Sequence, residues 1–303
     1  MTKVFIDGSA GTTGLRIEER LSNRTDIALI KIEEAYRKDV AARKDAINRA
    51  DIAFLCLPDA AAIEAVSLVE NESTAVIDTS TAHRVADGWI YGMPELVGQR
   101  EKIAKANRIA NPGCHASGFI ALVEPLISAG ILPPSTPLSA FSLTGYSGGG
   151  KKMIAEYEAE GRNELLGAPR QYGLSQSHKH LPEMVKICGL DTAPVFCPIV
   201  GDFYAGMEVT VALHGVDKKQ VEEVYLTRYA TGLIRYCREA DESGFLSAAA
   251  YAGRDTMEIS VQGNEQRLLL VARFDNLGKG ASGAAIQNMN IRMGVEESKG
   301  LEI

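Results

Sequence analysis

The sequence has few cysteines, no long hydrophobic run and no excess of positive charge, and each shortage excludes a class of protein. Five cysteines in 303 residues, with no Cys-x-x-Cys pair, argue against a disulfide framework or a zinc ribbon and favour a reducing compartment. No stretch approaches the ~18 apolar residues of a membrane span. Residues 3–7 already resemble a strand, which leaves no room for a signal peptide. We therefore expect a cytoplasmic protein with no membrane partner.

Charge and composition narrow the class further. The chain carries 32 Lys and Arg against 39 Asp and Glu, a net charge of −7. Such a chain gains nothing from the counterion release that drives nucleic-acid binding, so we expect no nucleic-acid partner. With 46% hydrophobic and 23% charged residues the composition is that of a globular enzyme. At ~100–200 residues per domain, the length predicts two domains.

The first third of the chain alternates between strand and helix patterns. Strands are expected at residues 4–6, 27–32, 52–57 and 75–78, with helices at 15–21, 41–50 and 60–69. The continuous apolar run at 52–57 is typical of a strand buried on both faces. This alternation predicts parallel βαβ units covered by helices on both sides.

After residue 138 the pattern changes to longer strands. These are expected at 139–144, 195–200, 208–214, 258–262 and 268–274, with helices near 153–162, 182–188 and 218–229. The mixture predicts an α+β domain with an antiparallel or mixed sheet. A last helix, 282–294, is expected to pack back on the first domain, and the boundary between domains is expected near residue 113.

A glycine-rich turn follows the first strand. Gly8, Gly11 and Gly14 allow a tight turn and close approach of a pyrophosphate, and the following helix N-terminus supplies N–H groups. The spacing is GxxGxxG instead of GxGxxG, and a purely structural turn is the alternative. Beyond the second strand, Glu33 or Glu34 would favour NAD, whereas Arg37 and Lys38 would bind the 2′-phosphate of NADP. The residues alone leave both cofactors open.

The motif Asn-Pro-Gly-Cys-His at 111–115 carries the candidate nucleophile. Strand-like residues precede it and a helix-compatible run, 118–127, comes after it, so Cys114 lies at or just before a helix N-terminus. The helix dipole stabilises a thiolate there, and an unperturbed thiol of pKa ~8.5 is only a few per cent ionised at pH 7. A buried structural cysteine is the alternative, and it is the expected role of Cys56, Cys188, Cys197 and Cys237.

The segment Ser-His-Lys-His-Leu-Pro-Glu at 177–183 offers the partner for that thiol. A histidine from a distant segment can activate a thiol or pass a proton to the product. His178 and His180 are the candidates, whereas His83, His115 and His214 have weaker cases. A metal site using His-x-His and Glu183 is the rival, but no third ligand cluster is evident, so we expect no metal.

The run Gly-Tyr-Ser-Gly-Gly-Gly-Lys-Lys at 145–152 nearly matches a P-loop. Lys152 stands where the Mg²⁺-binding Ser or Thr belongs, which excludes the NTPase interpretation. We expect a mobile, cationic glycine-rich loop beside an anionic substrate or cofactor.

Together these motifs resemble the N-acetyl-γ-glutamyl-phosphate reductases, in their shorter form, within the aspartate-semialdehyde dehydrogenase-like group. The likeness spans nearly the whole chain. It rests on GSAGTTG at 8–14, CLPD at 56–59, DTSTAHR at 78–84, YGMPEL at 91–96, NPGCHASG at 111–118, GYSGGGK at 145–151, SHKHLPEM at 177–184 and NLGKGASGAAIQNMN at 276–290.

The resemblance implies an α/β fold: a Rossmann-type NADP-binding domain of residues 1–113 plus 280–303, and an α+β mixed-sheet substrate and dimerisation domain of residues 114–279. It implies a homo-oligomer that uses NADPH to reduce an acyl phosphate, releasing phosphate, in arginine biosynthesis. Cys114 would attack the acyl carbon and His180 would be the acid/base, with His178 as the other candidate.

The remaining site residues are assigned from the resemblance together with the charges noted above. Those assigned to the cofactor are Gly8, Ala10, Gly11, Thr12, Gly14, Arg37, Lys38, Cys56, Pro58, Ser80, Ser147, Gly148, Gly149, Gln287 and Asn288. Those assigned to the substrate are Asn111, Arg84, Lys151 and His178, with Arg84 and Lys151 chosen on charge alone.

Three other functions compete with this one. An aspartate-semialdehyde dehydrogenase would share the chemistry, but the His-Lys-His motif and the Asn-Pro-Gly-Cys motif argue against it. A non-catalytic dinucleotide-sensing module is disfavoured by the intact Cys114 and His180. A cysteine hydrolase would need no dinucleotide site. An acyl chain one carbon longer would need only a slightly deeper pocket.

Overall fold

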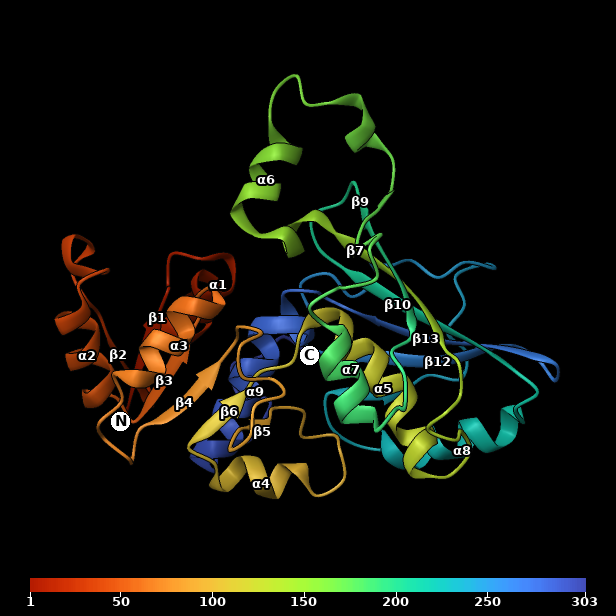
Figure 1. Ribbon diagram of the computed structural model, residues 1–303, viewed down its shortest axis with the longest axis horizontal. Coiled ribbons are helices and arrows are strands. Elements are labelled where there is room, and N and C mark those ends of the chain that lie inside the picture. Colours follow the sequence, from red (N-terminus) through yellow and green to blue (C-terminus); the bar gives the residue numbers. More distant parts are fainter. The chain divides into compact units, whose positions relative to one another are not determined.

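The computed structural model describes residues 1–303, and the chain divides into two compact units (Figure 1). Unit 1 comprises Met1–Pro112 together with Ala281–Leu301, and unit 2 comprises Gly113–Gly280 with the last two residues. Each unit is built on its own sheet, of six strands in unit 1 and seven in unit 2. No helix has both the length and the hydropathy that spanning a bilayer requires.

The sheet of unit 1 is parallel throughout, with the strand order β2-β1-β3-β4-β6-β5. Its strands are β1 (Thr2–Asp7), β2 (Ile27–Ile30), β3 (Ile52–Leu55), β4 (Ala75–Asp78), β5 (Ile90–Tyr91) and β6 (Arg108–Ala110). Its helices are α1 (Thr12–Ser22), α2 (Val40–Arg49), α3 (Asp59–Ser67), α4 (Gln99–Lys105) and α9 (Gly283–Met293), with a 3-10 turn η1 (Glu34–Tyr36). This is the doubly wound arrangement expected from the βαβ pattern.

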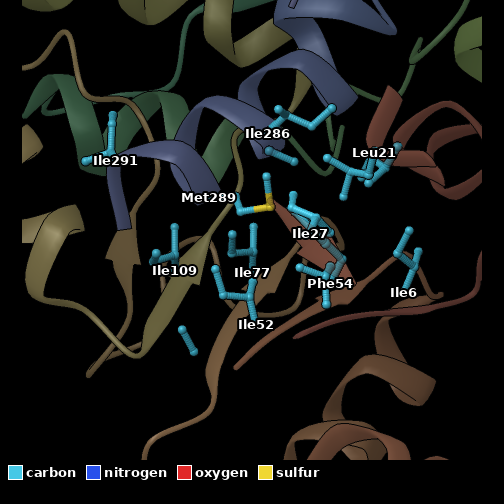
Figure 2. Packing of buried hydrophobic residues seen from close by; sticks show 14 of the residues in the cluster. Ile6, Leu21, Ile27, Ile52, Phe54, Ile77, Ile109, Ile286, Met289 and Ile291 are labelled. Atoms are coloured by element: carbon cyan, nitrogen blue, oxygen red, sulfur yellow. The ribbon is translucent and has the colours of Figure 1, made fainter. Parts of the chain in front are cut away.

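Both faces of this sheet are buried, because alternate side chains of each strand enter different cores. On one face Phe54 and Ile77 pack with Leu21 of α1 and with Ile286 and Met289 of α9 (Figure 2). On the other face the neighbouring strand residues pack with Ala46 and Ile47 of α2 and Ala65 of α3. The C-terminal helix α9 therefore completes the core of the N-terminal unit.

The sheet of unit 2 is mixed, with the order β11-β12-β13-β10-β7-β9-β8. Its strands are β7 (Ser139–Gly145), β8 (Arg170–Gln171), β9 (Val195–Gly201), β10 (Met207–His214), β11 (Ile234–Tyr236), β12 (Met257–Asn264) and β13 (Arg267–Phe274). Its helices are α5 (Cys114–Ser128), α6 (Gly150–Glu158), α7 (Leu181–Cys188) and α8 (Lys218–Arg228), with 3-10 turns η2 (Tyr146–Gly149) and η3 (Glu164–Gly167). A π-helical turn, η4 (Gly278–Ser282), follows β13.

The two faces of this sheet differ in their covering. Helices α5, α7 and α8 lie on one side of the sheet (Figure 1), and α5 packs directly on β10 and β13. Most side chains of α5 are therefore buried. On the opposite face Phe141 of β7, Val195 of β9 and Leu269 of β13 are about half exposed. An apolar strip of sheet thus remains open.

Two differences from the sequence predictions concern helix starts. The helix after Cys114 begins at Cys114 itself, four residues before the expected start, so the cysteine is its first residue. The glycine-rich segment 145–152 is not a loop: η2 leads directly into α6, and Lys151 and Lys152 lie in the first turn of that helix. The short elements β5, α4, β8 and β11 were not predicted.

Candidate functional site

The turn between β1 and α1 has a backbone that only glycine can adopt. Gly8 has φ +86°, and a Cβ at that position would lie 2.3 Å from the carbonyl oxygen of Cys56. A Cβ at Gly14 would lie 2.5 Å from the carbonyl oxygen of Gly8. Gly11, the N-cap of α1, has no side chain to cap the helix, so the first N–H groups of α1 face an open end. A phosphate could approach the backbone of such a turn closely.

A cavity of about 630 Å³ opens beside this turn in unit 1. It is lined by the turn residues Gly8 and Ala10, by the end of β2, and by Arg37 and Lys38. Glu34 lines it as well, and Glu33 does not. The remaining predicted residues of the turn, Gly11, Thr12 and Gly14, continue from this wall into α1.

Charges of both signs surround the cavity. Arg43 of α2 is buried, and its Nε donates to Asp7 Oδ2 at 3.0 Å while its Nη1 donates to Glu64 at 2.7 Å. Lys31 pairs with Glu18 at 2.7 Å, and Arg37 pairs with Glu34 at 2.9 Å. Four cations and three carboxylates therefore line the wall, with Arg43, Lys31 and Arg37 each beside a carboxylate. The wall carries one positive charge more than it carries negative charges.

Cys56 lies behind the turn and has a thiol that resists ionisation. Burial raises the pKa of the Cys56 thiol to about 12, so the thiol stays protonated at neutral pH. It meets the turn through its backbone oxygen, and Pro58 is the N-cap of α3. Ser80 lies after β4, where its N–H and Oγ both donate to the carboxylate of Asp78. Cys56 therefore contacts the turn through its backbone, and Ser80 binds the carboxylate of Asp78.

A second polar group in unit 1 joins α9 to the ends of β5 and β6. The amide of Asn288 donates to Gly92 O at 2.9 Å and to Asn111 Oδ1 at 3.1 Å. The amide of Asn111 donates to Ala281 O. Gln287 donates to Glu95 at 3.0 Å. These buried amides fix the loop that ends at Pro112, immediately before the cysteine motif.

Arg84 and His83 flank the same loop. Arg84 Nε donates to Asn111 O and its Nη2 to Thr79 O, both at 3.1 Å. His83 Nδ1 lies 2.6 Å from Asp78 Oδ2, and its ring stacks on Trp89 with centroids 4.1 Å apart. His83 had only a weak case as a catalytic residue, and the structure places it in a scaffold of aromatic and carboxylate contacts.

In unit 2, Cys114 is the first residue of α5. The N-cap residue Gly113 donates its N–H to Oε2 of Glu183 at 3.1 Å, and the Glu183 side chain is buried. Gly280 packs so closely that a Cβ there would lie 2.9 Å from Cys114 Cβ. Cys114 thus lies at the positive end of a helix, with the backbone of Gly280 packed against its Cβ.

Three histidines gather around this thiol. Cys114, His115 and His180 each place one donor atom within 4.8 Å of the others. The rings of His178 and His180 are 4.8 Å apart, and His178 Nδ1 accepts the backbone N–H of His180 at 3.3 Å. His180 is the N-cap of α7, so the Leu-Pro pair after it fixes the start of that helix.

His115 lies at the centre of the cluster, although its sequence case was weak. Its ring centroid is 5.4 Å from that of His180 and 5.6 Å from that of His178. Its Nδ1 lies 2.6 Å from Ser142 Oγ and its Nε2 lies 2.7 Å from the hydroxyl of Tyr172. Burial, with smaller contributions from His178 and Lys179, lowers the pKa of His115 to about 3. Adjacency to Cys114 was the one sequence signal for His115, and Tyr172 carried none.

The same cluster is also the place where a metal ion could bind. Cys114, His115 and His180 are the group whose donor atoms lie close enough for a shared ion. Both ring nitrogens of His115 are already within hydrogen-bonding distance of hydroxyls, so an ion would have to displace Ser142 or Tyr172. The expectation of no metal stays a prediction.

The glycine-rich segment after β7 forms a separate part of unit 2. Ser147 Oγ accepts from the amide of Asn276 at 3.0 Å, and Gly148 and Gly149 complete the 3-10 turn beside it. Lys151 is exposed in the first turn of α6. The structure therefore places Ser147 against the end of β13 and presents Lys151 to solvent.

Comparisons with known proteins agree with this architecture. Residues 9–106 match the family model "Semialdehyde dehydrogenase, NAD binding domain", and residues 114–276 match "Semialdehyde dehydrogenase, dimerisation domain". The chain has a fold similar to aspartate semialdehyde dehydrogenase II complexed with ASA from Vibrio cholerae (TM-score 0.73, 17% identity, 97% of this chain and 98% of that one). Its fold is also similar to that of aspartate semialdehyde dehydrogenase with NADP from Candida albicans (TM-score 0.68, 14% identity, 96% of this chain and 98% of that one).

Two curated relatives are much more similar in sequence. N-acetyl-γ-glutamyl-phosphate reductase 2 from Nostoc sp. is 46% identical, over 99% of this chain and 99% of that protein. N-acetyl-γ-glutamyl-phosphate reductase from Brucella anthropi is 49% identical, over 96% of this chain and 98% of that protein. Unit 1 is therefore a nicotinamide-dinucleotide-binding domain, and the chain belongs to the N-acetyl-γ-glutamyl-phosphate reductase family of oxidoreductases.

Proposed function

We propose that this protein uses NADPH to convert N-acetyl-glutamyl phosphate to N-acetyl-glutamate semialdehyde, releasing phosphate, in arginine biosynthesis. The observation that carries this proposal is the Cys114 thiol at the N-terminus of α5, close to the imidazole of His180. A thiol paired with a histidine forms an acyl-enzyme, and a thioester accepts hydride far more readily than a carboxylate does. The names of relatives at 46–49% identity support the substrate.

Cys114 is the nucleophile in this proposal. Its thiolate attacks the acyl carbon, the carbon–oxygen bond to the phosphate breaks, and inorganic phosphate leaves with the electron pair. When bound, the reduced nicotinamide supplies the hydride that converts the resulting thioester to a thiohemiacetal. The carbon–sulfur bond then breaks to give the aldehyde and regenerate the thiol. The N-terminus of α5, which no side chain caps, supports stabilisation of the oxyanion, an interaction whose loss costs about 3–4 kcal/mol elsewhere.

His180 is the acid/base in this proposal. Its position near Cys114 supports removal of the thiol proton and its return when the thiohemiacetal collapses. His178 contacts the His180 backbone through Nδ1, which supports an orienting and substrate-binding role for it. His115 does not compete for this task, because its low pKa keeps it neutral and both its nitrogens have hydroxyl neighbours.

The dinucleotide is proposed to bind with its pyrophosphate on the turn Gly8–Gly14. The glycine-only backbone and the uncapped start of α1 support this. Thr12 Oγ1 is a buried hydroxyl with no hydrogen-bond partner within the protein, as expected of a group that meets a ligand oxygen. At the other polar group, Asn288 Oδ1 is likewise buried without a partner, which supports the proposed role of Asn288 near the nicotinamide.

NADP is proposed as the preferred cofactor. The residue directly after β2, where NAD enzymes carry an acid, is Lys31. Arg37 and Lys38 line the same cavity and supply two further cations for a 2′-phosphate. Glu34 pairs with Arg37 there and offsets one cation, so Lys38 accounts for the excess positive charge of the wall. The net positive wall supports NADP over NAD.

Substrate anchoring is proposed for Arg84, Asn111 and Lys151. Lys151 is an exposed cation at the start of α6 and fits a carboxylate or phosphate. Arg84 holds the Asn111 carbonyl, so its contribution includes shaping the loop that carries Asn111. The hydrogen bonds of Arg84 to the carbonyl oxygens of Asn111 and Thr79 support this role in shaping the loop.

A homo-oligomer, through the open face of the unit 2 sheet, is part of the proposal. The match to a dimerisation domain supports it. The register places Phe141 opposite Cys197 and Thr210, and Ala212 opposite Leu269, so these side chains share the uncovered face. An apolar sheet face of this kind is buried effectively by a second copy of itself, as in sheet-on-sheet packing.

The reverse reaction tests the proposal most directly. Enzyme, N-acetyl-glutamate semialdehyde, phosphate and NADP⁺ are mixed and NADPH absorbance is followed, with NAD⁺ and aspartate semialdehyde as parallel controls. Phosphate-dependent NADPH formation confined to the N-acetylated substrate is the expected result. Turnover with aspartate semialdehyde alone would assign the same chemistry to a different substrate. Silence with both would reject the proposal.

A further inference from the structure

The His115 side chain has a set of contacts that the proposed chemistry does not use. It follows Cys114 on α5, it is 3% exposed, and its two nitrogens lie 2.6 Å from Ser142 Oγ and 2.7 Å from the Tyr172 hydroxyl. Ser142 lies on β7 and is itself buried, so one end of this chain of hydrogen bonds is fixed to the sheet. Tyr172 follows β8, where its N–H donates to Pro198 O.

The protonation of this chain of hydrogen bonds is constrained. Since the imidazole is neutral, it carries one N–H and one lone pair, whereas the two hydroxyls can each donate or accept. If Ser142 donates to Nδ1, Nε2–H donates to the Tyr172 oxygen, and the phenol proton is available to another acceptor. In the other tautomer the phenol proton is consumed by Nε2. The direction of the hydrogen bond between Ser142 and His115 therefore decides whether the Tyr172 hydroxyl can donate to another group.

Cys114 is the candidate acceptor, because its sulfur lies within 4.8 Å of a ring nitrogen of His115, and His115 Nε2 is 2.7 Å from the Tyr172 hydroxyl. Burial raises the pKa of the Tyr172 phenol well above its usual range, and negative charge on Cys114 raises that pKa further, so the phenol stays protonated at neutral pH. The other ionisable groups on the segments packed against Cys114 are His178 and Lys179 before α7, His180 at its N-cap, Glu183 in its first turn, and Asp275 and Lys279 on the segment that carries Gly280. Tyr172 is the neutral hydroxyl donor among them.

We propose that His115 is a positioning residue which, anchored by Ser142, holds the Tyr172 hydroxyl as a hydrogen-bond donor towards the Cys114 sulfur. The donor stabilises the thiolate before acyl transfer and again when the thiohemiacetal collapses. No proton is transferred along these hydrogen bonds. A neutral imidazole suits this place, because a second cation next to His180 would oppose protonation of that ring. The assignment deepens the proposed function, since it concerns the same thiol.

The first experiment measures Cys114 alone, with neither substrate nor cofactor. The rate of alkylation by iodoacetamide is followed against pH, which gives the apparent pKa of the thiol in the full-length protein. In Tyr172→Phe this pKa should rise by about one unit, so alkylation at pH 7 should slow about tenfold while the high-pH plateau stays unchanged. Tyr229→Phe is the matched control: its hydroxyl is also buried and donates to α5, at Ala121 O. That variant should leave the thiol pKa unchanged.

The second experiment asks whether His115 acts through Tyr172. His115→Phe should reproduce the alkylation change, and Ser142→Ala should give a smaller change in the same direction. The double variant, with His115→Phe and Tyr172→Phe, should be alkylated no more than about twofold more slowly than Tyr172→Phe alone, because the effects of coupled residues are not additive. In the reductase assay kcat should fall about tenfold with KM and NADPH affinity nearly unchanged.

Two results would overturn the proposal. One is a Tyr172→Phe protein whose thiol pKa matches wild type; the other is a double variant in which the two single effects multiply. If His115→Phe fails to fold, as judged by its melting curve, Tyr172→Phe and Ser142→Ala still decide the first question. Because alkylation needs no substrate, a shifted thiol pKa in a protein without reductase activity would reject the proposed function and retain this one.

Discussion

Replacing Gly8 by alanine tests the proposed phosphate-binding turn most sharply. A Cβ at Gly8 would lie 2.3 Å from the carbonyl oxygen of Cys56, whereas real Cβ atoms essentially never come within 3.0 Å of such atoms, so the two backbones must separate by about 0.7 Å. The residue also has φ +86°, which costs a non-glycine residue roughly 1–2 kcal/mol. Forced displacement in a packed core adds about 1–3 kcal/mol. We expect Gly8→Ala to destabilise unit 1 by about 2–5 kcal/mol.

The displaced turn should also lose cofactor. Each N–H that no longer reaches a phosphate oxygen forfeits a charge-assisted hydrogen bond of about 1.5–3 kcal/mol, or roughly a 10–100-fold loss of affinity. NADPH binding is measured by fluorescence titration, and stability by calorimetry with and without cofactor. Gly88→Ala is the control, since Gly88 has φ +79° but nothing within 4 Å of its Cβ position. Equal effects of the two substitutions, or wild-type NADPH affinity in Gly8→Ala, would refute the reasoning.

Four further outcomes are expected. Cys114→Ser should abolish reduction while NADPH affinity stays near wild type; retained turnover would remove Cys114 from the mechanism. His180→Asn should lower kcat by roughly 10²–10⁴, and if only His178→Asn does so in the same assay, the acid/base is His178. Lys38→Ala should weaken NADPH binding at least about tenfold and leave NADH binding unchanged, because only NADPH carries the extra phosphate; equal losses in titrations with both would contradict the cofactor proposal. His115 is neutral in the folded protein (pKa about 3) and ordinary when unfolded, so the unfolded chain binds the extra proton below pH ~6.5. Stability should therefore fall by up to ~1.4 kcal/mol per pH unit from pH 6.5 towards 3, and urea unfolding of His115→Gln should show a shallower fall.

The fold was predictable where periodic patterns are long. Strand β3 is an unbroken apolar run in the sequence because helices cover both faces of the parallel sheet. The helix of residues 218–228 begins after Asp217, a residue type that caps helices and whose side chain accepts the N–H of Lys219. The helix expected at 41–50 is present as α2, and Asp39, which accepts the N–H of Ala42, is its N-cap. The two-residue strands β5 and β8 could not be predicted. Such short strands form because a sheet edge is available for pairing, and two residues are too few to show a hydrophobic period in the sequence.

The site was predictable only where a backbone requirement marks it. Gly8 and Gly14 are dictated by contacts under 3 Å, and the Pro-Gly pair before Cys114 does begin a helix. Segment 145–152 was expected to be a loop because its glycines disfavour helix, but α6 starts at Gly150 and is sustained by the non-glycine residues of its later turns, with Tyr157 buried. Tyr172 and Ser142 reach His115 from two separate parts of the sheet, and no local pattern encodes such a meeting.

The return of α9 to the first unit has a consequence for synthesis. The face formed by Phe54, Ile77 and Leu21 is closed by Ile286 and Met289, which leave the ribosome after all of Gly113–Gly280. At ~5–20 residues per second, about 10–30 s pass before those side chains emerge. During that time the nascent parallel sheet carries an uncovered apolar face while unit 2 is still being made. A chain truncated before Gly283 would leave that face open permanently. We therefore expect chaperones to bind chains that lack α9 and to release chains in which α9 has packed on the sheet.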